Sequence, residues 1–347
     1  MRPLILAAVA LLASADAFQS SQIRRAGLAF SPSRTRSSST AITASNANEI
    51  FPLKQGSTVA LITPMTPTGE VDMPALRNIL RFHVESGTDG LCILGTTGEA
   101  STLSMAERAT VLTAAVEEVK GKIPIMAGVG TIDPEHVKEM TQQAIDVGCD
   151  AALVVTPYYV KPPQRGLVKH FLTMAEMGLP VVIYNVPGRT GVDFQSNNLA
   201  LCADHENIVA LKDATGDLDR LEEVRNYVGD KLLLYSGDDS TEAEYVLRGG
   251  DGCISVTANV APAQMHNLIM AALNKDVAEV EKINGPLKEL HNNLFCEANP
   301  IPAKWAVKRI GKMDSAYCRP PLDELAPEFH SLIEASLTEA GLLLPTQ

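Results

Sequence analysis

The chain has 347 residues, of which 46% are hydrophobic and 20% are charged, and its formal net charge at pH 7 is −12. This composition is that of a globular protein, and so acidic a chain is a poor match for nucleic acid or an anionic membrane as a partner. Its one long apolar run, residues 4–15, is too short to span a bilayer, so no transmembrane segment is expected.

The first 45 residues have the composition of a targeting sequence. Residues 1–17 combine Arg2 with an apolar centre and a small-residue end, which predicts a signal peptide. Residues 18–45 begin with Phe18 and contain four Arg, many Ser and Thr, and no Asp or Glu, as transit peptides do. Together they predict a two-part presequence and a location in the plastid (chloroplast stroma), with plain secretion as the alternative.

The charge and the cysteine spacing of the rest of the chain limit the kinds of site that it can contain. Without residues 1–45 the net charge becomes −16, because this segment holds five Arg and one Asp. The six cysteines are scattered and include no C-x-x-C pair, so neither a zinc site nor a disulfide framework is indicated. A reducing compartment suits such cysteines.

Eight short apolar segments alternate with segments of helical periodicity. The expected strands are residues 58–63, 90–95, 123–127, 151–156, 180–185, 208–212, 231–236 and 252–257. The helices expected between them include residues 74–86, 105–119, 134–147 and 218–228. Continuous apolar strands are covered on both faces, which favours a parallel sheet. Because no G-x-G-x-x-G follows the first strand, a closed (β/α)8 TIM barrel is favoured over an open doubly wound sheet.

From residue 261 the pattern is helical, and no further strand is expected. Candidate helices cover residues 263–273, 277–294, 301–310 and 325–340. The prolines at positions 320 and 321 break this part into segments. We therefore expect an α/β fold in which residues 46–260 form the barrel and residues 261–347 form a C-terminal helical region.

Lys212 ends the sixth expected strand, and the active site of a barrel lies at the C-terminal ends of its strands. An ammonium at that position must be desolvated or paired, and a desolvated amine is useful chiefly as a nucleophile. The alternative is a structural lysine, either paired with Asp213 or reaching solvent from the strand end. The residues alone leave these two interpretations evenly matched.

Two residues at the fifth expected strand suit the same chemistry. The Tyr184 hydroxyl could relay a proton to an adduct on Lys212, although a core tyrosine with a satisfied hydroxyl is somewhat commoner. Arg189, placed by a Pro-Gly turn, suits bidentate capture of a carboxylate. A solvated surface arginine is the alternative for that position.

The Gly-Thr-Thr-Gly segment at residues 95–98 puts two hydroxyls and close backbone N–H groups at another strand end. This arrangement could hold a small carboxylate, and a plain turn fits equally well. Asp238 and Asp239 could suggest a metal, but the seven histidines are dispersed and none clusters with them in the sequence. We expect neither a metal nor a cofactor.

Eight motifs occur in a characteristic order between about residue 56 and residue 343. They are residues 95–99 (GTTGE), 156–159 (TPYY), 184–187 (YNVP), 189–191 (RTG), 211–216 (LKDATG), 236–239 (SGDD), 254–259 (ISVTAN) and 299–304 (NPIPAK). Together they resemble the dihydrodipicolinate synthase family of pyruvate-dependent class I aldolases, within a superfamily that also contains N-acetylneuraminate lyase. Several motifs in the right order are more specific than any one of them.

The resemblance implies a lyase of the class I aldolase type. It would condense pyruvate with aspartate semialdehyde, as a 4-hydroxy-tetrahydrodipicolinate synthase does in the diaminopimelate pathway of lysine biosynthesis. By the same resemblance Lys212 forms the Schiff base, while Tyr184, Thr97 and Tyr159 form a proton relay. Because Tyr159 is contributed by a neighbouring subunit in this family, a homo-oligomer is implied, commonly a tetramer built as a dimer of dimers.

The resemblance also implies the substrate contacts. Thr96 and Thr97 would hold the pyruvate carboxylate, Arg189 would bind the carboxylate of aspartate semialdehyde, and Gly237 and Ile254 would place backbone carbonyls near the lysine. The sialic-acid branch typically has Ser in place of Thr96 and lacks the Arg-Thr-Gly, so these positions match the lysine-pathway branch. Another pyruvate-dependent aldolase, such as N-acetylneuraminate lyase, and a non-catalytic barrel scaffold are the alternatives.

One departure from the family pattern concerns regulation. Members that lysine inhibits bind it at a subunit interface, through positions that fall here on Met105, Arg108, Ile132 and His136. Tyr158 is retained, but the carboxylate that would pair with the ammonium of lysine is not. We therefore expect weak or absent inhibition by lysine, although Asp133 and Glu135 lie close enough in sequence to compensate.

Overall fold

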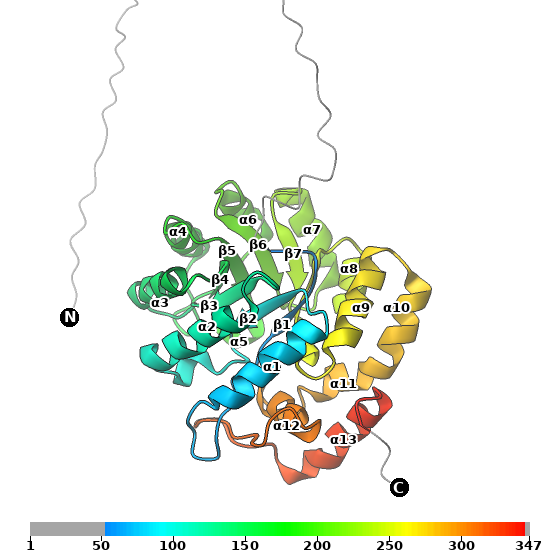
Figure 1. Ribbon diagram of the computed structural model, residues 1–347. Coiled ribbons are helices and arrows are strands. Elements are labelled where there is room, and N and C mark those ends of the chain that lie inside the picture. Colours follow the sequence, from blue (N-terminus) through cyan, green and yellow to red (C-terminus); the bar gives the residue numbers. More distant parts are fainter. Residues whose placement is uncertain (1–52, 344–347) are drawn as a thin grey trace, which may run out of the picture. The chain divides into compact units, whose positions relative to one another are not determined.

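The computed structural model describes residues 53–343 of the chain, and in it eight parallel strands close into a barrel in chain order (Figure 1). The strands are β1 (Gly56–Ala60), β2 (Gly90–Ile93), β3 (Ile125–Gly128), β4 (Ala151–Val155), β5 (Val181–Asn185), β6 (Ile208–Asp213), β7 (Leu233–Ser236) and β8 (Gly252–Ser255). The predicted (β/α)8 barrel is thereby confirmed. The signal and transit peptides predicted for residues 1–45 lie outside the described residues.

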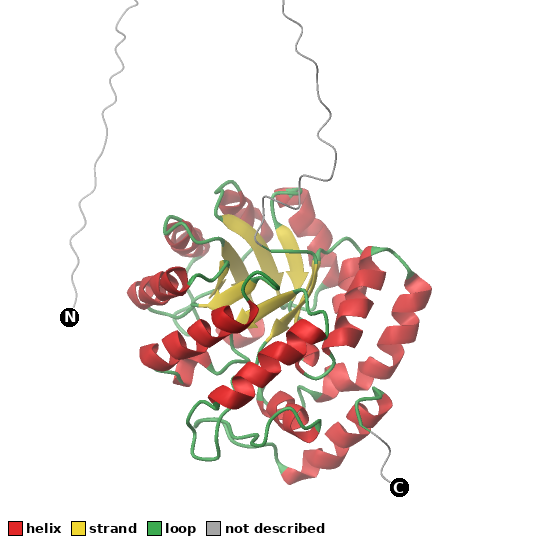
Figure 2. Cartoon of the chain, in the orientation of Figure 1, coloured by secondary structure: helices red, strands yellow, loops and turns green. Residues whose placement is uncertain are grey.

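Helices surround the barrel, as the red and yellow elements of Figure 2 show. The ring consists of α1 (Met73–Glu85), α2 (Met105–Val119), α3 (Pro134–Val147), α4 (Gln164–Ala175), α6 (Ser196–Ala203), α7 (Leu218–Val228), α8 (Glu242–Leu247) and α9 (Pro262–Leu273). Three short helical elements follow individual strands: η2 (Ala100–Thr102), α5 (Pro187–Thr190) and η3 (Thr257–Asn259). Within residues 53–343 no helix is long and apolar enough to cross a membrane.

The eighth helix of the ring, α9, lies beyond the predicted end of the barrel at residue 260. It packs against β1 and α8, so it completes the barrel and does not start the appendage. The boundary therefore moves to the end of α9. Sequence periodicity did not reveal this, because a ring helix and an appended helix have the same apolar pattern.

The C-terminal helices, drawn in yellow, orange and red in Figure 1, lie together beside the barrel. They are α10 (Val277–Asn284), η4 (Gly285–Leu287), α11 (Lys288–Asn293), α12 (Ile301–Arg309), η5 (Pro327–Phe329) and α13 (His330–Glu339). The single helix expected over residues 277–294 is interrupted by η4, at whose second position Pro286 removes a backbone donor. The last helix begins at residue 330 and not at 325, after a turn that contains Pro327.

Local capping residues set where the ring helices begin and end. At the start of α2, Ser104 and Glu107 form a capping box in which each side chain accepts from the other's backbone N–H. At the start of α3, Asp133 caps the first turn and Pro134 occupies the first helical position. Gly148 ends α3 at φ 90°, a backbone conformation that glycine adopts without strain.

The alternation of side chains along the strands decides which of them enter the barrel. Val182 and Tyr184 of β5 belong to the cluster that fills the interior, whereas Ile183 packs toward the helices. On β6 Ala210 is interior and Leu211 faces the helices, so Lys212 returns to the interior. The strand register places Tyr184 directly beside Lys212.

Candidate active site

A pocket of about 190 Å³ opens at the C-terminal ends of the strands and has Lys212 in its wall. Six of the eight predicted site residues line it: Thr96, Thr97, Tyr184, Arg189, Lys212 and Gly237. These residues come from the second, fifth, sixth and seventh strands or from the loops after them. The fold thus brings to one point side chains that are more than a hundred residues apart in sequence.

Lys212 is buried in the pocket wall, with 6% of its surface exposed. Its Nζ lies 4.4 Å from the centroid of the Tyr184 ring, and in the described part of the chain no carboxylate forms an ion pair with it. Asp213 points elsewhere, with its Oδ2 2.8 Å from Nε of Arg220. The interpretation of Lys212 as the partner of Asp213 therefore does not hold.

The groups around Lys212 leave room for its side chain, and none competes with its amine as a nucleophile. Burial raises the pKa of the Cys92 thiol to about 11, so this neighbour stays neutral and is a poor nucleophile at pH 7. A Cβ on Gly237 would lie 2.7 Å from Cε of Lys212 and 2.9 Å from Cβ of Ala214, so any other residue there would displace the lysine side chain. Gly237 therefore lets the lysine extend into the pocket along its present path.

Asn299, the first residue of the motif at residues 299–304, also lines the pocket, although the sequence alone indicated no role for it. It lies between α11 and α12, and its Nδ2 donates a hydrogen bond of 3.0 Å to Oγ1 of Thr97, a residue that is itself 3% exposed. Because the Thr97 oxygen accepts from the amide, its own proton is directed to another acceptor. Only the tertiary fold brings these two residues together.

The loop that carries Thr97 is held by a buried ion pair to the C-terminal helices. Glu99, a non-glycine residue with φ 52°, accepts from Nζ of Lys304 at 2.6 Å and from the backbone N–H of Arg319 at 2.9 Å. The side chains of Glu99 and Lys304 are 1% and 0% exposed. Thr63 also donates to the carbonyl of Gly98 at 2.7 Å, so both sides of the loop are fixed.

Three predicted residues occupy less enclosed or more remote positions. Arg189 lies on α5 at the pocket wall and is exposed. Tyr159 is 85% exposed, has φ 66° and does not line this pocket. Ile254 is buried in the barrel interior and its side chain is not part of the pocket lining.

A second polar cluster contradicts part of the reasoning about metals, because a histidine does lie beside Asp239. Ligand atoms of Asp239, Glu242 and His291 all lie within 4.8 Å of one another, and all three residues are buried. However, both ring nitrogens of His291 already have hydrogen-bond partners, Thr257 and Asn284. Asp239 accepts from the Ser255 hydroxyl and from two backbone N–H groups. Asp239 and His291 are therefore satisfied by neighbouring residues, whereas Oε1 of Glu242 is buried without a hydrogen-bond partner.

Residues 53–340 match the model of the Dihydrodipicolinate synthetase family. The chain belongs to this family. A relative from Thioalkalivibrio sulfidiphilus, named 4-hydroxy-tetrahydrodipicolinate synthase, is 47% identical over 83% of this chain and 98% of its own length. The relative of the same name from Methylococcus capsulatus is 46% identical over 83% of this chain and 99% of its own length.

Solved structures of the family agree with the fold. The dihydrodipicolinate synthase of Acinetobacter baumannii, crystallised with pyruvate and described as chloride-inhibited, is 44% identical and superposes with a TM-score of 0.82. The alignment covers 83% of this chain and 99% of that one. The enzyme from Cyanidioschyzon merolae, crystallised with lysine bound, is 32% identical with a TM-score of 0.81, over 84% of this chain and all of that one.

The comparisons contradict the predicted plastid location. The curated relatives with 43–47% identity come from bacteria, which have no plastid. The family match itself begins only at residue 53. The prediction rested on the Arg-rich and Ser-rich composition of residues 18–45, and composition by itself does not specify a compartment.

Proposed function

We propose that this chain joins pyruvate to aspartate semialdehyde through a Schiff base on Lys212, as a 4-hydroxy-tetrahydrodipicolinate synthase does. The observation that carries the proposal is the buried amine of Lys212, which has no carboxylate partner among residues 53–343 and faces a pocket beside Tyr184. Relatives of that name, aligned over nearly their full length, supply the substrate class.

The proposed chemistry follows from the groups in the pocket. The amine of Lys212 attacks the keto carbon of pyruvate, and loss of water gives a protonated imine. The imine withdraws electrons and so acidifies the pyruvate methyl group, which loses a proton to form an enamine. The enamine carbon attacks the aldehyde of aspartate semialdehyde. The amine of that substrate then displaces Lys212, closes the ring and frees the enzyme.

Two threonines and two tyrosines are the proposed binding and proton-transfer groups. Thr96 and Thr97 hold the pyruvate carboxylate, and Tyr184 exchanges protons with the adduct and with Thr97, the next member of the relay. The hydrogen bond from Asn299 to Thr97 supports this role, because it fixes the direction in which the threonine donates. Tyr159 completes the relay from a second subunit, a role that its 85% exposure supports.

Arg189 is proposed to bind the carboxylate of aspartate semialdehyde at the pocket mouth, where an exposed guanidinium can form two hydrogen bonds to it. Replacing it by Ala should raise KM for aspartate semialdehyde by about tenfold to a hundredfold, while the imine with pyruvate still forms. Steady-state kinetics and borohydride trapping test the two parts separately. Loss of imine formation in Arg189→Ala would contradict the assigned role.

A homo-oligomer is also proposed, built as a dimer of dimers. The segment from Tyr158 to Val160 presents three large apolar side chains to solvent, with exposures of 36%, 85% and 55%. Such a protruding apolar segment is stabilised when a second copy covers it. Sedimentation velocity measures the assembly, and Tyr159→Ser should both weaken it and lower kcat.

The deciding experiment combines trapping with a choice of aldehyde. Pyruvate and borohydride should add one reduced pyruvate to Lys212, detected by peptide mass, and Lys212→Met should remove the adduct. Condensation is then compared with aspartate semialdehyde and with N-acetylmannosamine. Turnover with the former supports the proposal, whereas trapping with turnover only of the latter moves the chain to the sialic-acid branch. If no adduct were trapped, the remaining interpretation would be a non-catalytic barrel scaffold.

A further inference from the structure

Asp238 lines the catalytic pocket, and the proposed reaction assigns no role to it. It follows β7 in the motif at residues 236–239, and within residues 53–343 it is the one acidic residue of the pocket lining. The same lining contains the cationic side chains of Lys212 and Arg189. A carboxylate at this place repels the carboxylates of both substrates, so it favours substrate binding only if it contacts a cation.

One oxygen of the Asp238 carboxylate is engaged, and the other is free to receive a ligand. Oδ2 accepts hydrogen bonds of 2.7 Å from the hydroxyls of Ser240 and Thr241, which hold the side chain next to the start of α8. Oδ1 has no hydrogen-bond partner within residues 53–343. Gly216, in the loop after β6, places no side chain over it, since a Cβ there would lie 4.0 Å from Oδ1. The half-buried carboxylate is therefore oriented by the protein and still accessible.

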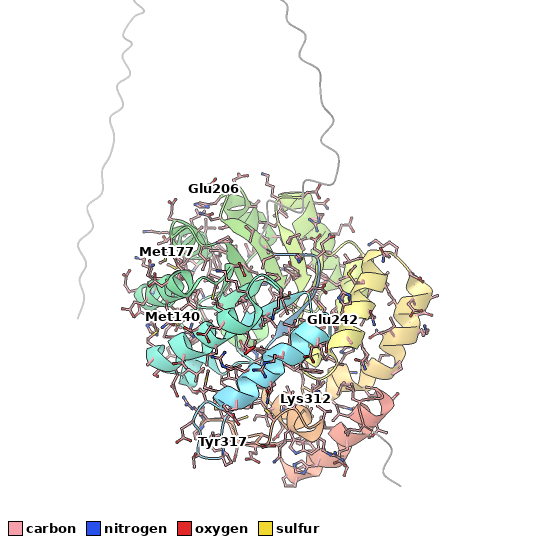
Figure 3. All side chains as sticks on the ribbon, viewed as in Figure 1. Met140, Met177, Glu206, Glu242, Lys312 and Tyr317 are labelled. Atoms are coloured by element: carbon pink, nitrogen blue, oxygen red, sulfur yellow. The ribbon has the colours of Figure 1, made fainter. Side chains whose placement is uncertain are left out.

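Asp238 and Arg189 reach the pocket from different elements. Arg189 lies on α5, whereas the loop that contains Asp238 leads into α8. In Figure 3 Glu242, the first residue of α8, lies on the opposite side of the barrel from Met140 of α3. The cavity of about 460 Å³ that Met140 lines does not include Asp238. Asp238 therefore belongs to the catalytic pocket.

We infer that Asp238 binds the ammonium group of aspartate semialdehyde and takes a proton from it when the ring closes. This substrate has an ammonium and a carboxylate on one carbon, and Arg189 is the group proposed for the carboxylate. A hydrogen bond from an ammonium to a carboxylate is charge-assisted and stronger than a neutral one. The inference deepens the proposed function and rests on it.

The proton balance of ring closure gives Asp238 its role. An ammonium has no lone pair, so one proton must leave before the nitrogen can attack, and Asp238 accepts that proton. The nitrogen then forms a bond to the imine carbon, whose π electrons pass to the nitrogen of Lys212. A proton moves from the ring nitrogen to the lysine nitrogen, the bond from carbon to Lys212 breaks, and the ring C=N bond forms. The released amine takes the last proton of the ring nitrogen, and Asp238 returns its own proton to solvent.

Asp238→Asn tests the contact with the ammonium. Its amide oxygen can still accept from Ser240 and Thr241, while an NH2 group replaces the oxygen that would receive the ammonium. KM for aspartate semialdehyde should rise by about tenfold to a hundredfold. The inhibition constant of 4-oxobutanoate, the same molecule without its amine, should not change. Equal weakening of both ligands, or an unchanged KM, would overturn the inference.

Borohydride quenching during turnover tests the proton transfer. In wild type, reduction should trap mainly the pyruvate adduct on Lys212, whereas in Asp238→Asn the larger condensed adduct should accumulate because its ring closes slowly. Peptide mass distinguishes the two adducts. A merely structural role of Asp238 would lower both adducts together, and that result, like an unchanged ratio, would contradict the assignment.

Asp230→Asn is the matched control, because it removes the same charge from a fully exposed carboxylate after α7. It should leave KM and the inhibition constant unchanged. A rise in KM equal to that of Asp238→Asn would show only a general charge effect, and the inference would fail. If wild type did not condense aspartate semialdehyde at all, the proposed function would fail; if it did and Asp238→Asn matched it, only this inference would fail.

A crystal structure keeps the inference testable if Asp238→Asn does not fold. Wild-type protein with the reduced pyruvate adduct is crystallised with L-2-aminobutanoate, which has the ammonium and the carboxylate of the substrate but no aldehyde. Its nitrogen should lie within hydrogen-bonding distance of Oδ1 of Asp238. An ammonium directed to solvent or to another residue would refute the assignment.

Discussion

Asn299 controls a single hydroxyl, and its contribution can be measured apart from substrate binding. Because its amide occupies an acceptor site of Thr97, its loss leaves that hydroxyl free to rotate. We expect Asn299→Ala to lower kcat by about tenfold to a hundredfold, a loss within the range for a misplaced proton-transfer group. Steady-state kinetics give kcat, and borohydride trapping should still show the imine.

Asn293→Ala is the matched control for Asn299→Ala. Asn293 lies in the same part of the chain, but its amide donates to Ser336 and not to a pocket residue. It should therefore leave kcat unchanged. If the two variants lost activity equally, the effect of Asn299 would be a general disturbance of the C-terminal helices and not the positioning of Thr97.

Glu242 is a second residue whose environment has a measurable consequence. Burial, together with the nearby Asp239, holds the pKa of the Glu242 carboxyl well above its ordinary range, and its Oε1 has no hydrogen-bond partner. The folded protein therefore keeps a proton that the unfolded chain releases above about pH 4.3. The contribution of this group to stability is present at low pH and is lost as the pH rises toward the folded pKa.

Glu242→Gln removes this pH dependence, because the amide does not ionise. We expect the stability of the variant relative to wild type to increase from pH 5 to pH 8, by up to about 1.4 kcal/mol per pH unit until the folded pKa is reached. Urea unfolding at the two pH values measures this difference. A difference that stays constant with pH would mean that Glu242 is ionised in the folded protein.

Among the elements, α12 and the loop after β2 depend on each other through the Glu99–Lys304 pair. Removing one partner leaves the other charge buried, so Lys304→Met should lower the free energy of unfolding by about 3–5 kcal/mol. The double variant Glu99→Gln, Lys304→Met should lose less free energy of unfolding than Lys304→Met alone, because no unpaired charge is left buried.

The control variant is Lys282→Met, which breaks an exposed ion pair with Glu279 and should cost below about 1 kcal/mol. Equal urea midpoints for Lys304→Met and Lys282→Met would refute this.

The strands were predictable from sequence, and so was the position of the lysine at the end of one of them. All eight expected apolar segments overlap observed strands, because a strand covered on both faces is continuously apolar over a few residues. Helix ends were less certain, since a turn such as Gly285–Leu287 interrupts the backbone without changing the apolar period. The role of α9 in the ring depends on packing, which periodicity does not report.

At the scale of the whole molecule, a cavity of about 460 Å³ lined by Arg108, His136, Tyr158 and Arg189 bears on the prediction about lysine. An ammonium group needs a carboxylate or several carbonyls to replace its water, and this cavity presents two guanidinium groups and no described carboxylate. We therefore expect no half-inhibition of condensation by lysine at sub-millimolar concentrations. An activity assay with increasing lysine tests this. Half-inhibition in that range would mean that Asp133 or Glu135 supplies the missing charge.

The sequence by itself determined the barrel, its eight strands and six of the residues that line the pocket around Lys212, because strand ends in a parallel barrel converge whatever the loops do. Only the tertiary structure decided that Asp213 pairs with Arg220 and not with Lys212, and that Asn299 reaches Thr97 across some two hundred residues. It alone also showed that Arg108 is buried and forms no ion pair with any residue from 53 to 343. Side-chain pairing depends on distances between elements, and those distances are fixed by packing.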